Sequence, residues 1–195
     1  MNNVTRQPAQ LRALDARTDG AALARLDLSF QKHRVLVVRR HATGFEFVEE
    51  MSSPPADGRY EVDWNELLGL GYALVAEQAG RLVGVAALRV TEWNRRGTVA
   101  HLYVDRPRRG MGIGSQLVAA LELESAERGV RALWVETQNV NVAAIRFYES
   151  CGFALCGLDM SLYDPAAVQS ETAIYLSKAI EPPHAASVSS DVAAL

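Results

Sequence analysis

Residues 101–115 read HLYVDRPRRGMGIGS, and this stretch decides the fold. An apolar strand ends at Val104, a basic loop follows, and alternating glycines lead into a helix. The first backbone N–H groups of a helix have no intrahelical partner and carry partial positive charge. Glycines let a large anion approach such groups closely. The stretch therefore predicts a cradle for a pyrophosphate group.

Three phosphate-binding motifs compete for this stretch. A Walker A loop would end in Gly-Lys-Ser/Thr, which is absent from the sequence. A dinucleotide fingerprint needs Gly-x-Gly-x-x-Gly and an acidic ribose partner, whereas the glycines here fall at 110, 112 and 114. The run Arg109 to Gly114 resembles the acyl-coenzyme A loop of the GNAT superfamily of N-acetyltransferases. The alternative is a tight strand–helix turn beside a solvated arginine run.

A second motif follows at residues 133–153, which read LWVETQNVNVAAIRFYESCGF. The pattern is strand, Asn-containing turn, short helix, glycine and aromatic, and it resembles the second GNAT motif. This resemblance implies a mixed α/β fold whose central sheet, flanked by helices, splays between its fourth and fifth strands. It also implies that the pantetheine arm of the cofactor lies in that gap.

The resemblance assigns residues to acetyl-coenzyme A (acetyl-CoA), the expected co-substrate. Tyr148 matches the general acid that protonates the departing thiolate, and Asn141 matches a cofactor contact. Each also has a structural alternative, because Asn141 suits a helix N-cap and Tyr148 suits an aromatic core. The expected cofactor-binding residues are Leu102, Tyr103, Val104, Arg109, Gly110, Met111, Gly112, Ile113, Gly114, Ser115, Asn141 and Tyr148.

Further stretches resemble the streptothricin acetyltransferases, namely residues 26–30, 44–50, 54–55, 92–96 and 153–164. The resemblance implies transfer of acetyl to the β-lysine amine of streptothricin. That family tends to carry acidic residues where this chain has Ala100, His101 and Tyr103. A cationic acceptor favours an acidic lining, so Glu136 and Asp159, which flank the predicted cleft, are candidate substrate-binding residues. Trp93, in the stretch 92–96, is a third candidate substrate-binding residue.

The chemistry requires a neutral amine. A lysine-type amine has a reference pKa near 10.4, so only about one in two thousand is neutral at pH 7. The sequence leaves the proton acceptor open between Glu136, His101 and water. A backbone N–H between Leu102 and Val104 is a candidate donor to the carbonyl oxygen.

Hydrophobic periodicity and turn signals predict the elements. Strands are expected at residues 10–16, 34–40, 45–50, 72–77, 81–91, 97–104, 132–136, 154–163 and 172–177. Helices are expected at residues 19–30, 64–70, 112–128 and 142–150, and a loop at 52–59. A single domain is expected over residues 1–180, with a Pro-, Ala- and Ser-rich disordered tail at 181–195.

Composition narrows the remaining possibilities. A net charge of −3 over 195 residues argues against a nucleic-acid partner. The absence of a long apolar run and of a signal peptide predicts a soluble, cytoplasmic protein with reduced Cys151 and Cys156 and no membrane partner. The histidine spacing predicts no metal site. A small-molecule amine is the expected partner, and a homodimer is left open. Alternatives are a GNAT enzyme for a polyamine, amino acid, protein lysine or N-terminus, or a non-catalytic acyl-CoA-binding module.

Overall fold

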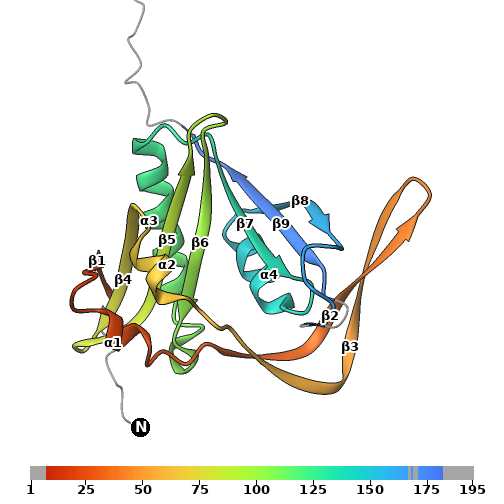
Figure 1. Cartoon of the computed structure of the whole chain (residues 1–195), viewed down its shortest axis with the longest axis horizontal. Coiled ribbons are helices and arrows are strands. Elements are labelled where there is room, and N and C mark those ends of the chain that lie inside the picture. The colour runs from red at the N-terminus through yellow and green to blue at the C-terminus, as the bar shows by residue number, and fades with distance from the viewer. Residues whose placement is uncertain (1–7, 167, 169–170, 182–195) are drawn as a thin grey trace, which may run out of the picture.

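The computed structural model describes residues 8–166, 168 and 171–181. In this part of the chain a seven-stranded mixed sheet has the order β1-β4-β5-β6-β7-β9-β8, and β2 and β3 form a separate two-stranded ribbon (Figure 1). The strands are β1 (Gln10–Ala13), β2 (Ser29–His41), β3 (Gly44–Arg59), β4 (Tyr72–Gln78), β5 (Arg81–Thr91), β6 (Arg96–Val104), β7 (Ala132–Gln138), β8 (Ala154–Asp159) and β9 (Ala173–Ala179).

Helices cover both faces of this sheet. They are α1 (Gly20–Leu23), α2 (Trp64–Leu68), α3 (Ile113–Glu127) and α4 (Val142–Ser150). Because successive side chains of a strand point to opposite faces of the sheet, the core is divided between the two faces. Leu74 and Ala76 pack in the larger core with α3 and α4, whereas Val75 packs in a smaller core with residues of α1 and α2. The predicted mixed α/β fold is confirmed.

The sheet opens between β6 and β7, which are its fourth and fifth strands in spatial order. The two strands run parallel and pair only where residues 96–98 meet residues 132–134. Beyond this point β6 stays paired with β5, and β7 stays paired with β9. A bulge leaves Ala100 as an extra residue, because Ala87 is opposite His101 and Leu88 is opposite Val99. The predicted splay is therefore confirmed.

The β2–β3 ribbon is longer than its sequence predicts. The hairpin turn falls at the expected place, since His41 pairs with Gly44. The expectation of a loop at residues 52–59 is wrong, because β3 continues to Arg59. Prolines normally break a strand, but Pro54 and Pro55 fall within the register shift that follows Lys32. In Figure 1 the ribbon runs from the α1 side of the sheet past the ends of β6 and β7, and its tip projects beyond β8 and β9.

Two other expected elements are shorter than predicted. The helix expected at residues 19–30 ends at Leu23, because Leu26 and Leu28 alternate into the smaller core and Ser29 already pairs in β2. The strand expected at residues 154–163 ends at Asp159. The carboxylate of Asp159 accepts hydrogen bonds from the backbone N–H and hydroxyl of Ser161, which turns the chain.

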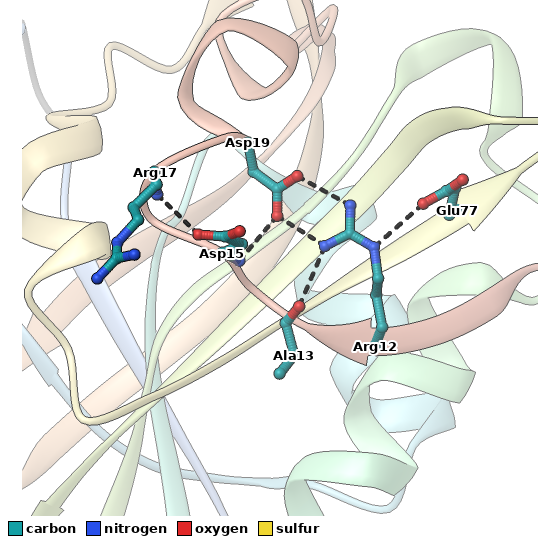
Figure 2. A network of polar contacts seen from close by, with 6 residues as sticks. All are labelled: Arg12, Ala13, Asp15, Arg17, Asp19 and Glu77. Carbon is teal, nitrogen blue, oxygen red and sulfur yellow. Dashed lines mark hydrogen bonds and ion pairs between the residues drawn. The ribbon is translucent and has the colours of Figure 1, made fainter.

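The side chain of Asp19 does not cap α1, although aspartate is a preferred N-cap residue. Its buried carboxylate instead accepts two hydrogen bonds from the Arg12 guanidinium, at 2.7 and 2.8 Å, and one from the Asp15 N–H (Figure 2). Arg12 also donates to Glu77 on β4. This network fixes the segment after β1 against the edge of the sheet, and the Arg12 hydrogen bonds lower the pKa of Asp19.

Asp19→Asn is expected to lower the free energy of unfolding by about 2 kcal/mol at pH 7. Removing one partner of a fully buried pair costs about 3–5 kcal/mol, and this pair is less buried because the Arg12 side chain is 42% exposed. Because the folded-state pKa of Asp19 is depressed, its contribution is present above the unfolded value near 3.9 and is lost as the pH falls through the folded value. Urea unfolding at pH 7 and pH 3 checks this, and a difference from wild type that is as large at pH 3 as at pH 7 would contradict it.

Cys151 and Cys156 are free thiols, as the sequence predicts. None of the described helices combines the length and apolar character that crossing a bilayer requires. The described residues also contain no cluster of three His, Cys, Asp or Glu side chains that would hold a metal ion. Residues 182–195, where the disordered tail is expected, lie outside the described residues.

Candidate active site

A cleft of about 580 Å³ occupies the gap between β6 and β7. It is lined by residues of both strands, the loop after β6, the start of α3, the helix α4 and the ribbon. Nearly all the residues expected to bind the cofactor line it. The lining is Phe30, Tyr60, Val99, Ala100, Leu102, Tyr103, Val104, Arg108, Arg109, Gly110, Gly112, Ile113, Gly114, Ser115, Val135, Glu136, Thr137, Asn141, Ala143, Ala144, Phe147 and Tyr148.

Backbone amides at the start of α3 form one end of the cleft. The helical hydrogen-bond ladder begins with the Gln116 N–H donating to the Gly112 carbonyl, so the N–H groups of residues 113–115 precede it. Gly112 has φ +82° and provides no side-chain cap, and Gly110 has φ +72°. A Cβ at either glycine would meet no atom within 4 Å. The positive φ and the open space together make this end suited to a bulky anion.

Gly114 differs from Gly110 and Gly112 because its lack of a side chain serves packing. A Cβ at this position would lie 3.0 Å from two ring carbons of Phe147. The missing side chain therefore lets α4 pack closely on the start of α3. Met111, also expected to bind the cofactor, is not among the lining residues and packs against the larger core.

The Arg109 guanidinium is engaged with backbone carbonyls. It donates to Val104 at 3.0 Å and to Ser29 at 2.6 Å, with a longer contact to Asp27 at 3.4 Å. The backbone N–H of Asp27 in turn donates to the Asp105 carboxylate. Arg109 thus lines the cleft as expected, but its side chain ties the ribbon to the end of β6.

Asn141 caps α4, which confirms the structural interpretation of this residue. Its Oδ1 accepts from the Ala144 N–H at 3.1 Å, and its Nδ2 donates to the Tyr60 hydroxyl at 2.6 Å. The Tyr60 hydroxyl then donates to Gln138 Oε1 at 3.0 Å. Tyr60 therefore joins the ribbon to the end of β7 and to the helix that carries Tyr148.

Tyr148 packs among aromatic side chains and also borders the cleft. Its ring packs between Phe147 and Phe153, with centroid distances of 5.3 and 5.5 Å, and it is 7% exposed. It also lines the cleft. Burial raises the pKa of Tyr148 far above its ordinary value, so the hydroxyl keeps its proton at any physiological pH. A tyrosine in this state is a hydrogen-bond donor.

The expected substrate-binding residues do not come together. Glu136 lines the cleft and accepts a hydrogen bond from the Tyr163 hydroxyl. Trp93 lies in the β5–β6 turn, is 86% exposed and does not line the cleft. Asp159 is also absent from the lining, since its carboxylate is engaged in the turn after β8. Trp93 follows β5 at the end of the sheet where β6 and β7 are still paired, whereas Asp159 lies at the open end of the sheet on β8, two strands from β7. A role of either residue in substrate binding stays a prediction.

His101 is a poor candidate for a proton acceptor at this site. It does not line the cleft, and its Nε2 is buried without a hydrogen-bond partner in the described part of the chain. Its Nδ1 lies 3.5 Å from the Tyr103 hydroxyl, and burial lowers the pKa of His101.

Sequence reasoning missed Phe30, Tyr60 and Tyr163. Phe30 lies on β2 and Tyr60 directly follows β3; their rings stack with a centroid distance of 5.0 Å, and Tyr60 also lies against Tyr103 at 5.7 Å. Their contacts join segments that are separated by up to about eighty positions in the chain. Nothing local in the sequence marks such a contact.

Known proteins resemble the chain over most of its length. Residues 38–153 match the acetyltransferase (GNAT) family. A streptothricin acetyltransferase of Streptomyces lavendulae is 34% identical over 169 residues, which cover 82% of this chain and 89% of the relative. A streptothricin acetyltransferase of Escherichia coli is 31% identical, with coverage of 68% and 75%.

Solved structures give the same result. A nourseothricin acetyltransferase superposes with a TM-score of 0.81 at 34% identity, covering 90% of this chain and all of that one. A Bacillus anthracis protein described as a streptothricin acetyltransferase, and solved in complex with acetyl coenzyme A, superposes with a TM-score of 0.77 at 27% identity. It covers 90% of this chain, and this chain covers all of it.

Proposed function

Because the chain belongs to the GNAT acetyltransferase family, we propose that it transfers the acetyl group of acetyl-CoA to a primary amine, the β-lysine amine of streptothricin. The observation that carries this proposal is the cleft itself, which joins free helix amides at one end to Tyr148 and Glu136. The similarity to streptothricin acetyltransferases over 82% of the chain supports the choice of amine.

Acetyl-CoA fits the cleft by the chemistry of its lining. The amides of residues 112–115 would hold the diphosphate, with Arg108 nearby as a lining cation. Beyond Thr98 the edge of β6 has no partner strand in β7, so the amide-bearing pantetheine arm has free backbone groups to pair with. The bound co-substrate supplies an activated acyl group whose leaving thiol has a reference pKa near 8.5.

Tyr148 is proposed as the general acid. A thiolate leaves more readily when a hydroxyl donates to its sulfur, and Tyr148 remains protonated because burial raises its pKa. The short helix α4 fixes the distance of this hydroxyl from β7, and Asn141 fixes the start of that helix. A backbone N–H of β6 between Leu102 and Val104 is the proposed donor to the carbonyl oxygen.

Glu136 is proposed to bind the acceptor as an ammonium ion. Reference pKa values near 4.3 for a carboxyl group and 10.4 for an alkylammonium make direct proton transfer between them unfavourable by about 8 kcal/mol. A carboxylate at this position therefore serves better as an electrostatic anchor than as the base. Water that enters the cleft is proposed to carry the proton to bulk solvent, where deprotonation of the amine at pH 7 costs about 4–5 kcal/mol.

Acetyl transfer to streptothricin is tested with purified protein by following thiol release from acetyl-CoA. The expected result is stoichiometric thiol release and a mass increase of one acetyl group on the β-lysine moiety. Polyamines, free amino acids, a protein lysine and a peptide N-terminus form the comparison panel. Turnover of another amine in preference to streptothricin would contradict the choice of substrate, and binding of acetyl-CoA without any turnover would indicate a non-catalytic module.

Two parts of the proposal concern the cell and the assembly. A cytoplasmic location is proposed because the acetyl donor is a metabolite of that compartment. A homodimer is the assembly to test, and analytical ultracentrifugation distinguishes it from a monomer. Residues 1–180 are proposed to form one domain.

A further inference from the structure

Glu136 is an acidic residue of the cleft that forms no ion pair among the described residues. Of the described residues that line the cleft, it alone has a carboxylate, whereas Arg108 and Arg109 line the cofactor end. None of the ion pairs formed within the described part of the chain includes Glu136. The nearby acid Glu171 is neutralised by Lys32 at 2.7 Å. The charge of Glu136 is therefore left for a ligand.

The carboxylate lies within electrostatic reach of the reacting groups. Burial is the main cause of the raised pKa values of Tyr60, Tyr103 and Tyr148, and the charge of Glu136 contributes to each. A cation bound to Glu136 would consequently lie close to the hydroxyl proposed as the general acid. Glu136 and Tyr148 line the same cleft.

A single side chain holds the Glu136 carboxylate in the described structure. The Tyr163 hydroxyl donates to Glu136 Oε1 from the segment that follows β8. Burial and the Glu136 hydrogen bond both raise the pKa of Tyr163, so the phenol stays a donor and does not become an anion. A donor of this kind occupies one carboxylate oxygen and leaves the second free to accept from an ammonium.

We propose that Tyr163 is a positioning residue for the acceptor, which orients Glu136 so that its free carboxylate oxygen receives the ammonium of a cationic amine. The inference rests on the proposed function and adds a substrate preference to it. The enzyme selects acceptors that carry the reacting amine as a protonated, lysine-like group, because a neutral arylamine would gain nothing from this carboxylate. Tyr163 acts only through Glu136 and does not touch the reacting atoms.

A double-mutant cycle tests this coupling. Tyr163→Phe removes one oxygen and is expected to raise KM for streptothricin about tenfold, since hydrogen bonds to charged groups are the strong ones. KM for acetyl-CoA and kcat are expected to change by less than about twofold. In the Glu136→Gln background the same replacement is expected to have an effect below about twofold, because two residues that act as one unit are not additive. Tyr175→Phe is the matched control, since Tyr175 stacks on Trp134 and does not line the cleft.

The outcomes separate this inference from the proposed function. An unchanged KM in Tyr163→Phe, or an equal effect in both backgrounds, overturns the positioning role. If the wild-type protein does not acetylate streptothricin, the proposed substrate fails, and the same cycle is then measured with whichever amine of the panel is acetylated. If no amine is turned over, the cycle is read from the Tm of the free protein. The Tm of the double variant is then expected to equal that of the single variants. A Tm loss in the double variant that equals the sum of the two single losses would overturn the inference.

Discussion

Tyr148→Phe is expected to lower kcat at least about a hundredfold, because a positioned general acid contributes about 10²–10⁴ to the rate. The Kd for acetyl-CoA is expected to stay within about twofold, because the lost hydroxyl acts on the departing sulfur and not on ground-state binding. The hydroxyl has no hydrogen-bond partner among the described residues, so its removal leaves no protein group unpaired. Steady-state kinetics with single-turnover thiol release measures the change.

Tyr72→Phe is the control for this experiment. Tyr72 lies on β4, away from the cleft, and loses the same single atom. It is expected to behave like the wild type. A kcat of Tyr148→Phe near that of the wild type would contradict the acid role and would leave Tyr148 with the packing role that its contacts to Phe147 and Phe153 support.

Gly112→Asp is expected to weaken coenzyme A binding about a hundredfold or more. Two like charges about 5 Å apart repel by about 3 kcal/mol at an effective dielectric constant near 20, and each tenfold in Kd corresponds to about 1.4 kcal/mol. Asp is among the residues that tolerate positive φ, and a Cβ at this position meets no atom within 4 Å. The loss would therefore come from the charge at the helix start. Calorimetric titration with coenzyme A measures it.

Gly129→Asp is a matched control at the other end of α3. Gly129 also has positive φ, at +67°, and open space around its Cβ position. The substitution thus adds the same charge and similar backbone strain far from the cleft. Equal losses of coenzyme A affinity in both variants would show that strain or net charge, and not the anion site, is responsible.

Much of the fold follows from local chemistry. The turn at Ala79 and Gly80, both with positive φ, joins β4 and β5 where a two-residue hairpin is expected. The helix α4 has the predicted bounds because Asn141 caps its start and Gly152, at φ +86°, follows its end. Local propensity fails to predict the structure where pairing with a distant strand overrides it. Residues 52–59 read as a loop because of their prolines, yet they pair with β2 around a register shift.

The cofactor half of the site is visible in the sequence because it is built from two contiguous motifs. The glycines that begin α3 and the helix that carries Tyr148 need only a strand–loop–helix order to be recognised. The acceptor half is assembled from distant segments instead. Phe30 comes from β2, Tyr60 directly follows β3, and Tyr163 comes from the segment after β8. Phe30 and Tyr60 reach the cleft through the path of the ribbon and Tyr163 reaches Glu136 from the segment after β8, and no local pattern encodes either approach.

The same distinction applies to the two expected substrate-binding residues that do not line the cleft. Trp93 and Asp159 lie in stretches that resemble the streptothricin acetyltransferases, but resemblance in sequence does not say which end of a strand faces the cleft. Trp93 follows β5 at the end where β6 and β7 are still paired, and the cleft opens only beyond Thr98. The Arg109 side chain is engaged by carbonyls of residues 29 and 104, which no motif predicts.

A crystal structure of the protein with acetyl-CoA tests the central claim most directly. The diphosphate oxygens are expected to lie within hydrogen-bond distance of the backbone N–H groups of residues 112–115. The thioester sulfur is expected to lie beside the Tyr148 hydroxyl. A diphosphate bound elsewhere, or a thioester far from Tyr148, would contradict it.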